Sequence, residues 1–144
     1  VYYITDRTMS ELQKKPKYVY FPYAPLKIAL LPSDRAVLHE RIADRFEAML
    51  ELGLISELRG LRKSYALEAT MPSMRCVGYR QAWDYLDEKI SLSQLREQGI
   101  AATRQLAKRQ LTWLRATSDI VEFDCLSEDL ESQVLTYLQE YLQA

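Results

Sequence analysis

The chain has 144 residues, 48% of them hydrophobic and 27% charged, a composition typical of one soluble globular domain or a piece of one. Its formal net charge of −1 excludes a uniformly basic nucleic-acid-binding protein, so any basic surface must be local. No apolar run approaches the roughly 20 residues that span a bilayer, and no signal peptide opens the chain. Cys76 and Cys125 stand alone, which argues against a disulfide framework or a zinc site and fits the reducing cytoplasm. The apolar opening at Val1 leads us to expect that the chain starts inside a larger protein.

The first elements are expected to be a short helix and a strand. Residues 8–11 have capping-box spacing and predict a helix that ends around Pro16. The aromatic, proline-punctuated stretch 18–25 is expected to be extended or looped. The apolar run 26–31, closed by Pro32, predicts a mostly buried strand.

Two helices and a loop should follow. Ser33 or Asp34 is expected to cap a helix that runs to about Leu52, because apolar residues recur there with a 3.6-residue period. A second short helix should follow, with its apolar side at Ile55, Leu58 and Leu61. Residues 63–74 lack periodicity and predict a loop, and residues 79–86 predict one or two helical turns.

The longest helix should begin at Ser91, which opens a second capping box, and continue to about Arg115. Gly99 inside it costs about 1 kcal/mol relative to alanine, which predicts the close approach of another backbone. The inner line is expected to comprise Leu95, Ala102, Leu106 and Trp113, widened by Ala107, Leu111 and Leu114.

A second strand is predicted at residues 120–123, followed by a last helix that Ser127 caps. The residues of this helix expected to face inward are Leu130, Val134, Leu138, Tyr141 and Leu142. Two apolar strands among long helices predict a parallel α/β sheet, although two strands are too few to complete one.

Common catalytic motifs are missing from the printed sequence. No glycine belongs to a GxxxxGK[ST] phosphate loop or to GxGxxG, and no Ser-His-Asp or Cys-His arrangement can be assembled. The single histidine, His39, lies on a predicted helix without an evident catalytic partner, which favours a structural role over a catalytic one.

Three groups of basic residues could carry chemistry. Arg41 and Arg45 share one helix face. They are either paired with Glu40, Asp44 or Glu47, which periodicity favours, or they form a phosphate clamp.

Residues 75–80 place two arginines, a glycine and a tyrosine at a loop-to-helix junction, which fits an RNA contact or an ordinary helix entry equally well. Residues 104–115 hold four cations and no carboxylate, a pattern that favours a polyanion partner over a solvated face. Arg104, Lys108 and Arg115 fall on one side of that helix, with Gln105, Arg109 and Thr112 beside them.

Two stretches closely resemble the bacterial tRNA dimethylallyltransferases, also called tRNA isopentenyltransferases. They are Pro72–Gln81, which reads PSMRCVGYRQ, and Ala102–Arg115, which reads ATRQLAKRQLTWLR. The pattern RIxxRFxxMLxxGL within residues 38–54 and the segment 8–12 agree with that family. The resemblance covers nearly the whole chain and weakens after about Asp124.

The resemblance implies the C-terminal part of a P-loop-like α/β core, with residues 1–20 ending a helical insertion and residues 21–144 belonging to the core. It implies transfer of a dimethylallyl group from dimethylallyl diphosphate to N6 of an adenosine beside the anticodon in the tRNA anticodon stem-loop. It also implies a cytoplasmic monomer that requires magnesium. The family's phosphate loop, general base and magnesium ligands lie in its N-terminal half, outside these residues, so we expect this stretch alone to be inactive. A non-catalytic helical RNA-binding module is the alternative.

Residue by residue, the resemblance implies that Arg45 is catalytic, holding the diphosphate and stabilising leaving-group charge. Two segments resemble family regions that contact tRNA, and in the second of them the alternative for Trp113 and Leu114 is a packing role in the core. The first segment is Arg75, Cys76, Val77, Gly78, Tyr79 and Arg80, and the second is Lys108, Arg109, Gln110, Leu111, Thr112, Trp113, Leu114 and Arg115.

Overall fold

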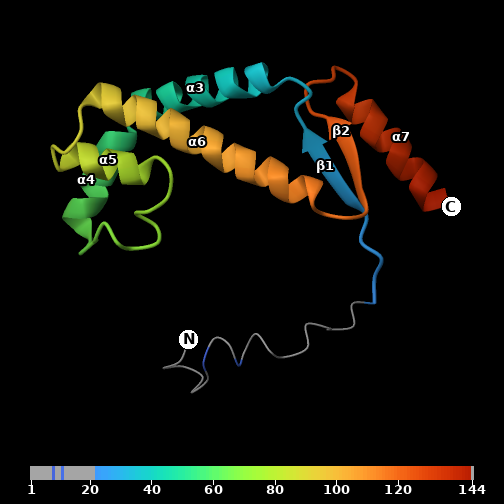
Figure 1. The fold of residues 1–144 in the computed structure, drawn as a ribbon, viewed down its shortest axis with the longest axis horizontal. Helices are drawn as coiled ribbons and strands as arrows, with labels where there is room; N and C mark the ends of the chain where they lie inside the picture. The colour runs from blue at the N-terminus through green and yellow to red at the C-terminus, as the bar shows by residue number, and fades with distance from the viewer. Residues whose placement is uncertain (1–7, 9–10, 12–21, 144) are drawn as a thin grey trace.

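The computed structural model describes residues 22–143 together with Thr8 and Glu11. Its elements, in chain order, are β1 (Lys27–Leu31), α3 (Arg35–Glu51), α4 (Leu54–Ser64), α5 (Tyr79–Leu86), α6 (Leu92–Arg115), β2 (Ile120–Asp124) and α7 (Leu130–Gln143). This part of the chain is mostly helical with two short strands, which confirms the predicted α/β class (Figure 1). Within it, no helix combines the length and apolar character needed to cross a membrane.

The capping box predicted near the start is present. The Thr8 N–H donates to Oε2 of Glu11 at 2.8 Å, and the Glu11 N–H donates to Oγ1 of Thr8 at 3.3 Å. The rest of the helix predicted there, including its end near Pro16, lies outside the described residues. The remainder of segment 1–20 and the first part of the stretch 18–25, up to residue 21, also lie outside the described residues.

The two strands form the parallel pair that the sequence predicts. Their register runs from Lys27 opposite Ile120 to Leu31 opposite Asp124. The expectation that β1 is mostly buried is wrong, because Ala29 is its only fully buried residue and Leu30 is 51% exposed. Among the described residues the sheet has two strands, so neither of them is an inner strand covered on all sides.

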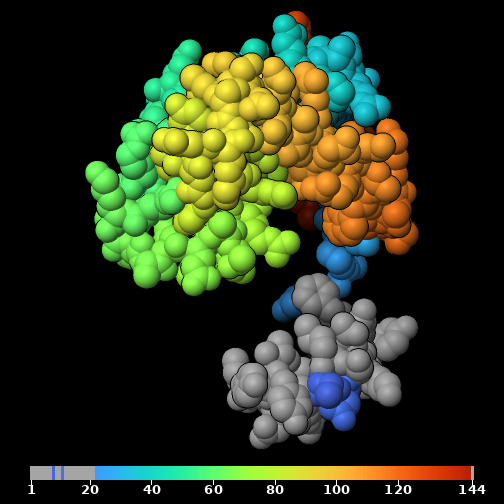
Figure 2. All heavy atoms as spheres, turned by 60° about the vertical axis from the view of Figure 1, so that its left-hand side comes forward, coloured from blue at the N-terminus to red at the C-terminus, as the bar shows by residue number. Residues whose placement is uncertain are grey.

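The buried core lies among the helices. It consists of Phe46, Leu54, Leu58, Met74, Ala82, Trp83 and Leu95. We call α4, α5 and the adjoining ends of α3 and α6 the helical lobe, and β1, β2 and α7 the strand lobe. In Figure 1, α3 and α6 link the two lobes and diverge toward the sheet. Figure 2 shows the two lobes joined across the top, with the surface hollowed between them underneath.

Gly99 allows α3 and α6 to pack closely. A Cβ atom at this position would lie 1.9 Å from Cζ of Phe46, whose side chain is 2% exposed. The predicted close approach is therefore present, but an aromatic ring approaches the glycine and not a backbone. The phenyl ring fills the space that any larger residue at position 99 would occupy.

Two further expectations about burial, on α6 and α7, are wrong. On α6, Trp113 is 68% exposed and Leu106 is 39% exposed, because the apolar side that was expected to face inward continues beyond the stretch of α6 that α3 covers.

The last helix, α7, starts at Leu130, three residues after Ser127, whose hydroxyl accepts from the Asp129 N–H. At its far end, Tyr141 is 44% and Leu142 81% exposed, since α7 packs mainly along β2.

Candidate functional site

A cavity of about 340 Å³ lies where α3, α6 and the loop before α5 meet. Arg41 and Arg45 line it from α3, Val77 from the loop, and Thr103 from α6. The remaining wall is apolar and consists of Leu38, Ile42, Phe46, Met49 and Leu106. We call this space the arginine cavity. It brings the predicted catalytic arginine beside a residue of the first predicted tRNA-contacting segment.

The two arginines of this cavity lack the partners that periodicity favours. Among the described residues, no carboxylate lies within the 4.0 Å ion-pair distance of either Arg41 or Arg45. Glu47, one of the expected partners, instead pairs with Arg96 of α6 at 2.5 Å. Two exposed guanidinium groups on one helix face repel each other, and an anion bound between them would relieve that repulsion.

The segment Arg75–Arg80 lies at the entry to α5. Gly78 is the N-cap at φ +94°, and its N–H donates to Oε1 of Gln81 at 2.9 Å. Val77 faces the arginine cavity, whereas Arg75 and Arg80 line a separate hollow of about 330 Å³ beside Trp83. Cys76 is exposed, and its Sγ lies 3.7 Å from the Pro72 carbonyl oxygen. The structure therefore divides this segment between two cavities.

Tyr79 is engaged within the protein. Its hydroxyl donates a hydrogen bond to Oε1 of Glu57 on α4. This bond is the main reason that the pKa of Tyr79 lies above its ordinary value, and burial and the negative charge of Glu57 add to the shift. The phenol thus stays a neutral donor to Glu57, and the hydroxyl group is already occupied.

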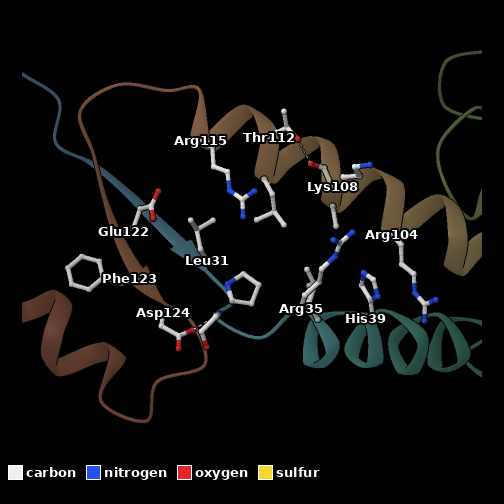
Figure 3. Close-up of a pocket in the computed structure, with 15 residues that line it drawn as sticks. Leu31, Arg35, His39, Arg104, Lys108, Thr112, Arg115, Glu122, Phe123 and Asp124 are labelled. Carbon is white, nitrogen blue, oxygen red and sulfur yellow. Dashed lines mark hydrogen bonds between the residues drawn. The ribbon is translucent and has the colours of Figure 1, made fainter.

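A larger cavity, of about 590 Å³, lies between α3, the second half of α6 and the carboxyl ends of both strands. In Figure 3 the side chains of Arg35 and His39 on α3 point toward α6, and Arg115 points from α6 into the same space. We call it the cationic cavity. Its lining from α6 is Arg104, Ala107, Lys108, Leu111, Thr112 and Arg115, and its lining from the strand ends includes Leu31, Pro32, Ser33, Glu122, Phe123 and Asp124.

The residues of the second predicted tRNA-contacting segment, Lys108–Arg115, lie on different faces of α6. Lys108, Leu111, Thr112 and Arg115 line the cationic cavity, and the Thr112 hydroxyl donates to the Lys108 carbonyl at 2.9 Å. The others do not line it: Arg109, Gln110 and Trp113 are exposed, and Leu114 is half-buried. Exposed Trp113 therefore contradicts the packing alternative for that residue within the described part of the chain.

The charges of the cationic cavity are not neutralised by close ion pairs. Among the described residues, Arg35, Arg104, Lys108 and Arg115 have no carboxylate within 4.0 Å. The sequence interpretation missed Arg35 and treated His39 as structural, although the structure places both in the cavity wall. Their spacing of four residues, directly after a strand, was the available signal, since helices that follow parallel strands often border ligand sites.

The two cavities adjoin each other at Leu38. Leu38 lines both of them, with the arginine cavity on the side of the helical lobe and the cationic cavity on the side of the sheet. In open α/β sheets, ligands bind in the crevice at the carboxyl ends of the strands, where the cationic cavity lies.

Asp124 joins the two carboxyl ends of the sheet. Its Oδ1 accepts from the Ser33 N–H at 3.0 Å and from the Leu126 N–H at 2.9 Å. Hydrogen bonding from Ser33 is the main reason that the pKa of this carboxyl lies below its ordinary value, and the bond from Leu126 is the next cause. The carboxylate thus fixes the loop that enters α3 against the turn that follows β2.

Replacing Asp124 with asparagine is expected to remove part of the acid sensitivity of the fold. Because the folded pKa is lowered, ionised Asp124 contributes stability above the unfolded pKa of about 3.9, and that stability is lost as pH falls through the folded pKa. Urea unfolding between about pH 6 and pH 2 should show a smaller loss of stability for Asp124→Asn than for the unchanged chain. Identical losses would show that these hydrogen bonds do not stabilise the charged form.

The described residues offer no evident magnesium site, because no three His, Cys, Asp or Glu side chains among them gather closely enough to hold a metal ion. Both cysteines are free thiols.

Unpaired cations at the carboxyl edge of a parallel pair, beside a partly apolar cavity, define an α/β protein suited to a ligand that bears phosphate. The sequence model described as IPP transferase matches residues 1–117. The chain therefore belongs to the IPP transferase family, as its sequence motifs predict.

Relatives and solved structures agree with this assignment. The chain is 52% identical over 140 residues to a tRNA dimethylallyltransferase of Nitrosomonas eutropha and 56% identical over 142 residues to one of Thiobacillus denitrificans. These matches cover 97% and 98% of this chain but only 44% and 45% of the relatives, so the chain spans less than half of their length.

Two crystal structures share the fold. The full-length tRNA isopentenylpyrophosphate transferase of Bacillus halodurans has a TM-score of 0.76 at 30% identity, covering 85% of this chain and 40% of that one. The tRNA delta(2)-isopentenylpyrophosphate transferase of Staphylococcus epidermidis has a TM-score of 0.71 at 26% identity, covering 97% and 45%.

Proposed function

We propose that the whole protein containing these residues transfers a dimethylallyl group from dimethylallyl diphosphate to N6 of the adenosine next to the tRNA anticodon. The observation that carries the proposal is the arginine cavity, in which Arg41 and Arg45, without ion-pair partners among the described residues, lie next to Val77. Guanidinium groups bind diphosphate oxygens with matching geometry, and the apolar wall suits a prenyl chain. The names of the relatives support the same reaction.

In this proposal the N6 nitrogen forms a bond to C1 of the dimethylallyl group as the bond from C1 to the diphosphate oxygen breaks. The leaving diphosphate gains negative charge, which Arg45 stabilises by electrostatic attraction. The N6 proton passes to a general base that the family resemblance places outside these residues. Flipping the adenosine out of its stack costs a few kcal/mol, which contacts from Arg75–Arg80 and Lys108–Arg115 offset.

Three further parts of the proposal rest on the family resemblance. They are a magnesium requirement, with ligands outside the described residues, a monomeric state and a cytoplasmic location.

Mass spectrometry of tRNA is the direct test of this function. The whole protein, incubated with tRNA and dimethylallyl diphosphate, should add one dimethylallyl group to the adenosine beside the anticodon. The cationic cavity also fits the second candidate, a helical RNA-binding module without chemistry. RNA binding without any mass increase would favour that candidate over the transferase.

Replacing both Lys108 and Arg109 with alanine is expected to weaken tRNA binding and flatten its salt dependence. Each phosphate that the protein no longer neutralises should reduce the slope of log K against log salt by somewhat under about 1 unit, because fewer counterions are released. Different tRNAs should be affected about equally, since phosphates carry no direct sequence information, and binding of dimethylallyl diphosphate should stay nearly unchanged. A salt titration of tRNA affinity measures this effect.

The matched control removes two exposed cations from α4, with Arg59→Ala and Lys63→Ala in one variant. It changes net charge by the same amount without touching the cationic cavity. Equal slopes for the unchanged protein and the Lys108/Arg109 variant would show that these two cations face solvent and that α6 is only a scaffold.

A further inference from the structure

We infer that Glu57 is a positioning residue for tRNA: it holds Tyr79 and thereby sets the conformation of the Arg75–Arg80 segment. The inference rests on the proposed function, because it assigns the way in which one RNA-contacting segment of that site is held. Glu57 lies in the first turn of α4, outside every segment that the sequence motifs point to. Its Oε1 accepts the hydroxyl proton of Tyr79, 22 residues later in the chain.

This contact acts where the segment turns into a helix. Tyr79 is the first residue of α5, and Gly78 before it has φ +94°, a conformation that glycine adopts readily and most other residues do not. A tyrosine side chain tied to another helix fixes the direction in which α5 starts. That direction places Val77 at the arginine cavity and Arg75 and Arg80 at the neighbouring hollow.

A second contact from α4 holds the rest of α5. The guanidinium carbon of Arg62 lies 4.1 Å from the centre of the Trp83 ring, and Arg62 pairs with Asp87 at 2.8 Å. Arg62 thus secures the middle and the end of α5, and Glu57 secures its beginning. The polar contacts of Arg62 lie at Trp83 and Asp87, so among the described residues the Glu57 bond is the polar contact from α4 whose loss should disturb the RNA-facing segment itself.

The charge of Glu57 makes the inference sharply testable. An exposed carboxylate near an RNA-binding segment repels phosphates, so its removal should tighten tRNA binding if charge were its only effect. Loss of positioning has the opposite sign and should weaken tRNA binding. The direction of the change therefore separates the two roles.

The experiment compares Glu57→Ala, Glu57→Gln and Tyr79→Phe in the whole protein, with tRNA affinity and steady-state kinetics as readouts. Glu57→Ala and Tyr79→Phe should each raise the Kd and KM for tRNA by about 5- to 10-fold, the scale expected from one charge-assisted hydrogen bond near the surface. The KM for dimethylallyl diphosphate and kcat at saturating tRNA should change by less than about 2-fold, a split that general destabilisation would not produce. Glu57→Gln should restore most of the affinity, because its amide oxygen still accepts from the phenol.

Two further variants complete the test. The double variant Glu57→Ala/Tyr79→Phe should bind no more weakly than either single variant, since both remove the same bond. Glu51→Ala, which removes an exposed carboxylate from the end of α3, should leave tRNA affinity unchanged or slightly tighter. Glu57→Ala behaving like Glu51→Ala, or additive losses in the double variant, would overturn the inference.

The readouts also keep this inference apart from the proposed function. Unchanged protein that fails to bind tRNA would overturn both. Unchanged protein that binds tRNA but transfers no dimethylallyl group would overturn the transferase proposal alone, and the Kd values would still decide the role of Glu57.

Discussion

Replacing Arg45 with alanine in the whole protein is expected to lower kcat by about 100-fold or more, the loss typical of one preorganised electrostatic donor. Arg45 lines the arginine cavity, is exposed, and has no ion-pair partner among the described residues, so its guanidinium is available to the diphosphate. Arg45→Lys should restore little activity, because an ammonium group cannot offer the two parallel donors of the guanidinium fork. Single-turnover transfer of the dimethylallyl group to tRNA measures this effect.

Arg59→Ala is the matched control for this prediction. Arg59 is an exposed arginine of α4 that does not line the arginine cavity, and its loss should leave kcat unchanged. Should Arg45→Ala keep full kcat and lower only the melting temperature, Arg45 would be a structural residue and would not stabilise the leaving diphosphate.

Replacing Gly99 with alanine is expected to destabilise the fold by about 1–3 kcal/mol, as overpacking of a filled core does. The new Cβ would lie within 1.9–2.6 Å of three ring atoms of Phe46, so the ring must move or the two helices must separate. Higher helix propensity of alanine offsets up to about 1 kcal/mol of this cost. Urea unfolding of the chain gives the difference in free energy of unfolding.

The same substitution at Gly60 provides a control with the opposite sign. Gly60 lies within α4, and a Cβ atom there would have nothing within 4 Å, so Gly60→Ala should stabilise by up to about 1 kcal/mol. Adding Phe46→Leu to Gly99→Ala should recover part of the loss, because the ring that clashes is gone. A stabilised Gly99→Ala variant would contradict the close packing of α3 on α6.

Local sequence signals predicted the elements well. Asp34 and Ser91 cap the helices that they were expected to cap, and residues 79–86 form α5 with the expected bounds. Such features depend on hydrogen bonds and periodicities within a few residues, which any sequence displays directly.

Burial at the ends of the helices could not be predicted in the same way. The apolar stripe of α6 continues through Leu106 to Trp113, but α3 covers only the part near Gly99. Periodicity identifies which face of a helix is apolar, and it carries no information about how far the neighbouring element extends along that face.

The sequence predicted only part of the candidate site, for a related reason. Arg45 and Lys108 were found from local patterns and from the resemblance, whereas Arg35 and His39 become part of the site only because α3 and α6 diverge around the cationic cavity. A cavity between two helices far apart in the chain is a property of their packing. The four-residue spacing of Arg35 and His39 indicates that they share a helix face, but it does not specify the cavity that this face borders.

Because α6 borders both cavities, the rotation of this helix about its own axis determines which of its side chains line each cavity. Thr103 and Leu106 face the arginine cavity, whereas Arg104 and Lys108 face the cationic one. One residue inserted after Leu106 would turn all later residues by about 100° and advance them by about 1.5 Å, which would carry Lys108 and Arg115 away from α3. Changes of length in this helix are therefore tolerable only in steps of three or four residues, which keep the later residues close to their present faces.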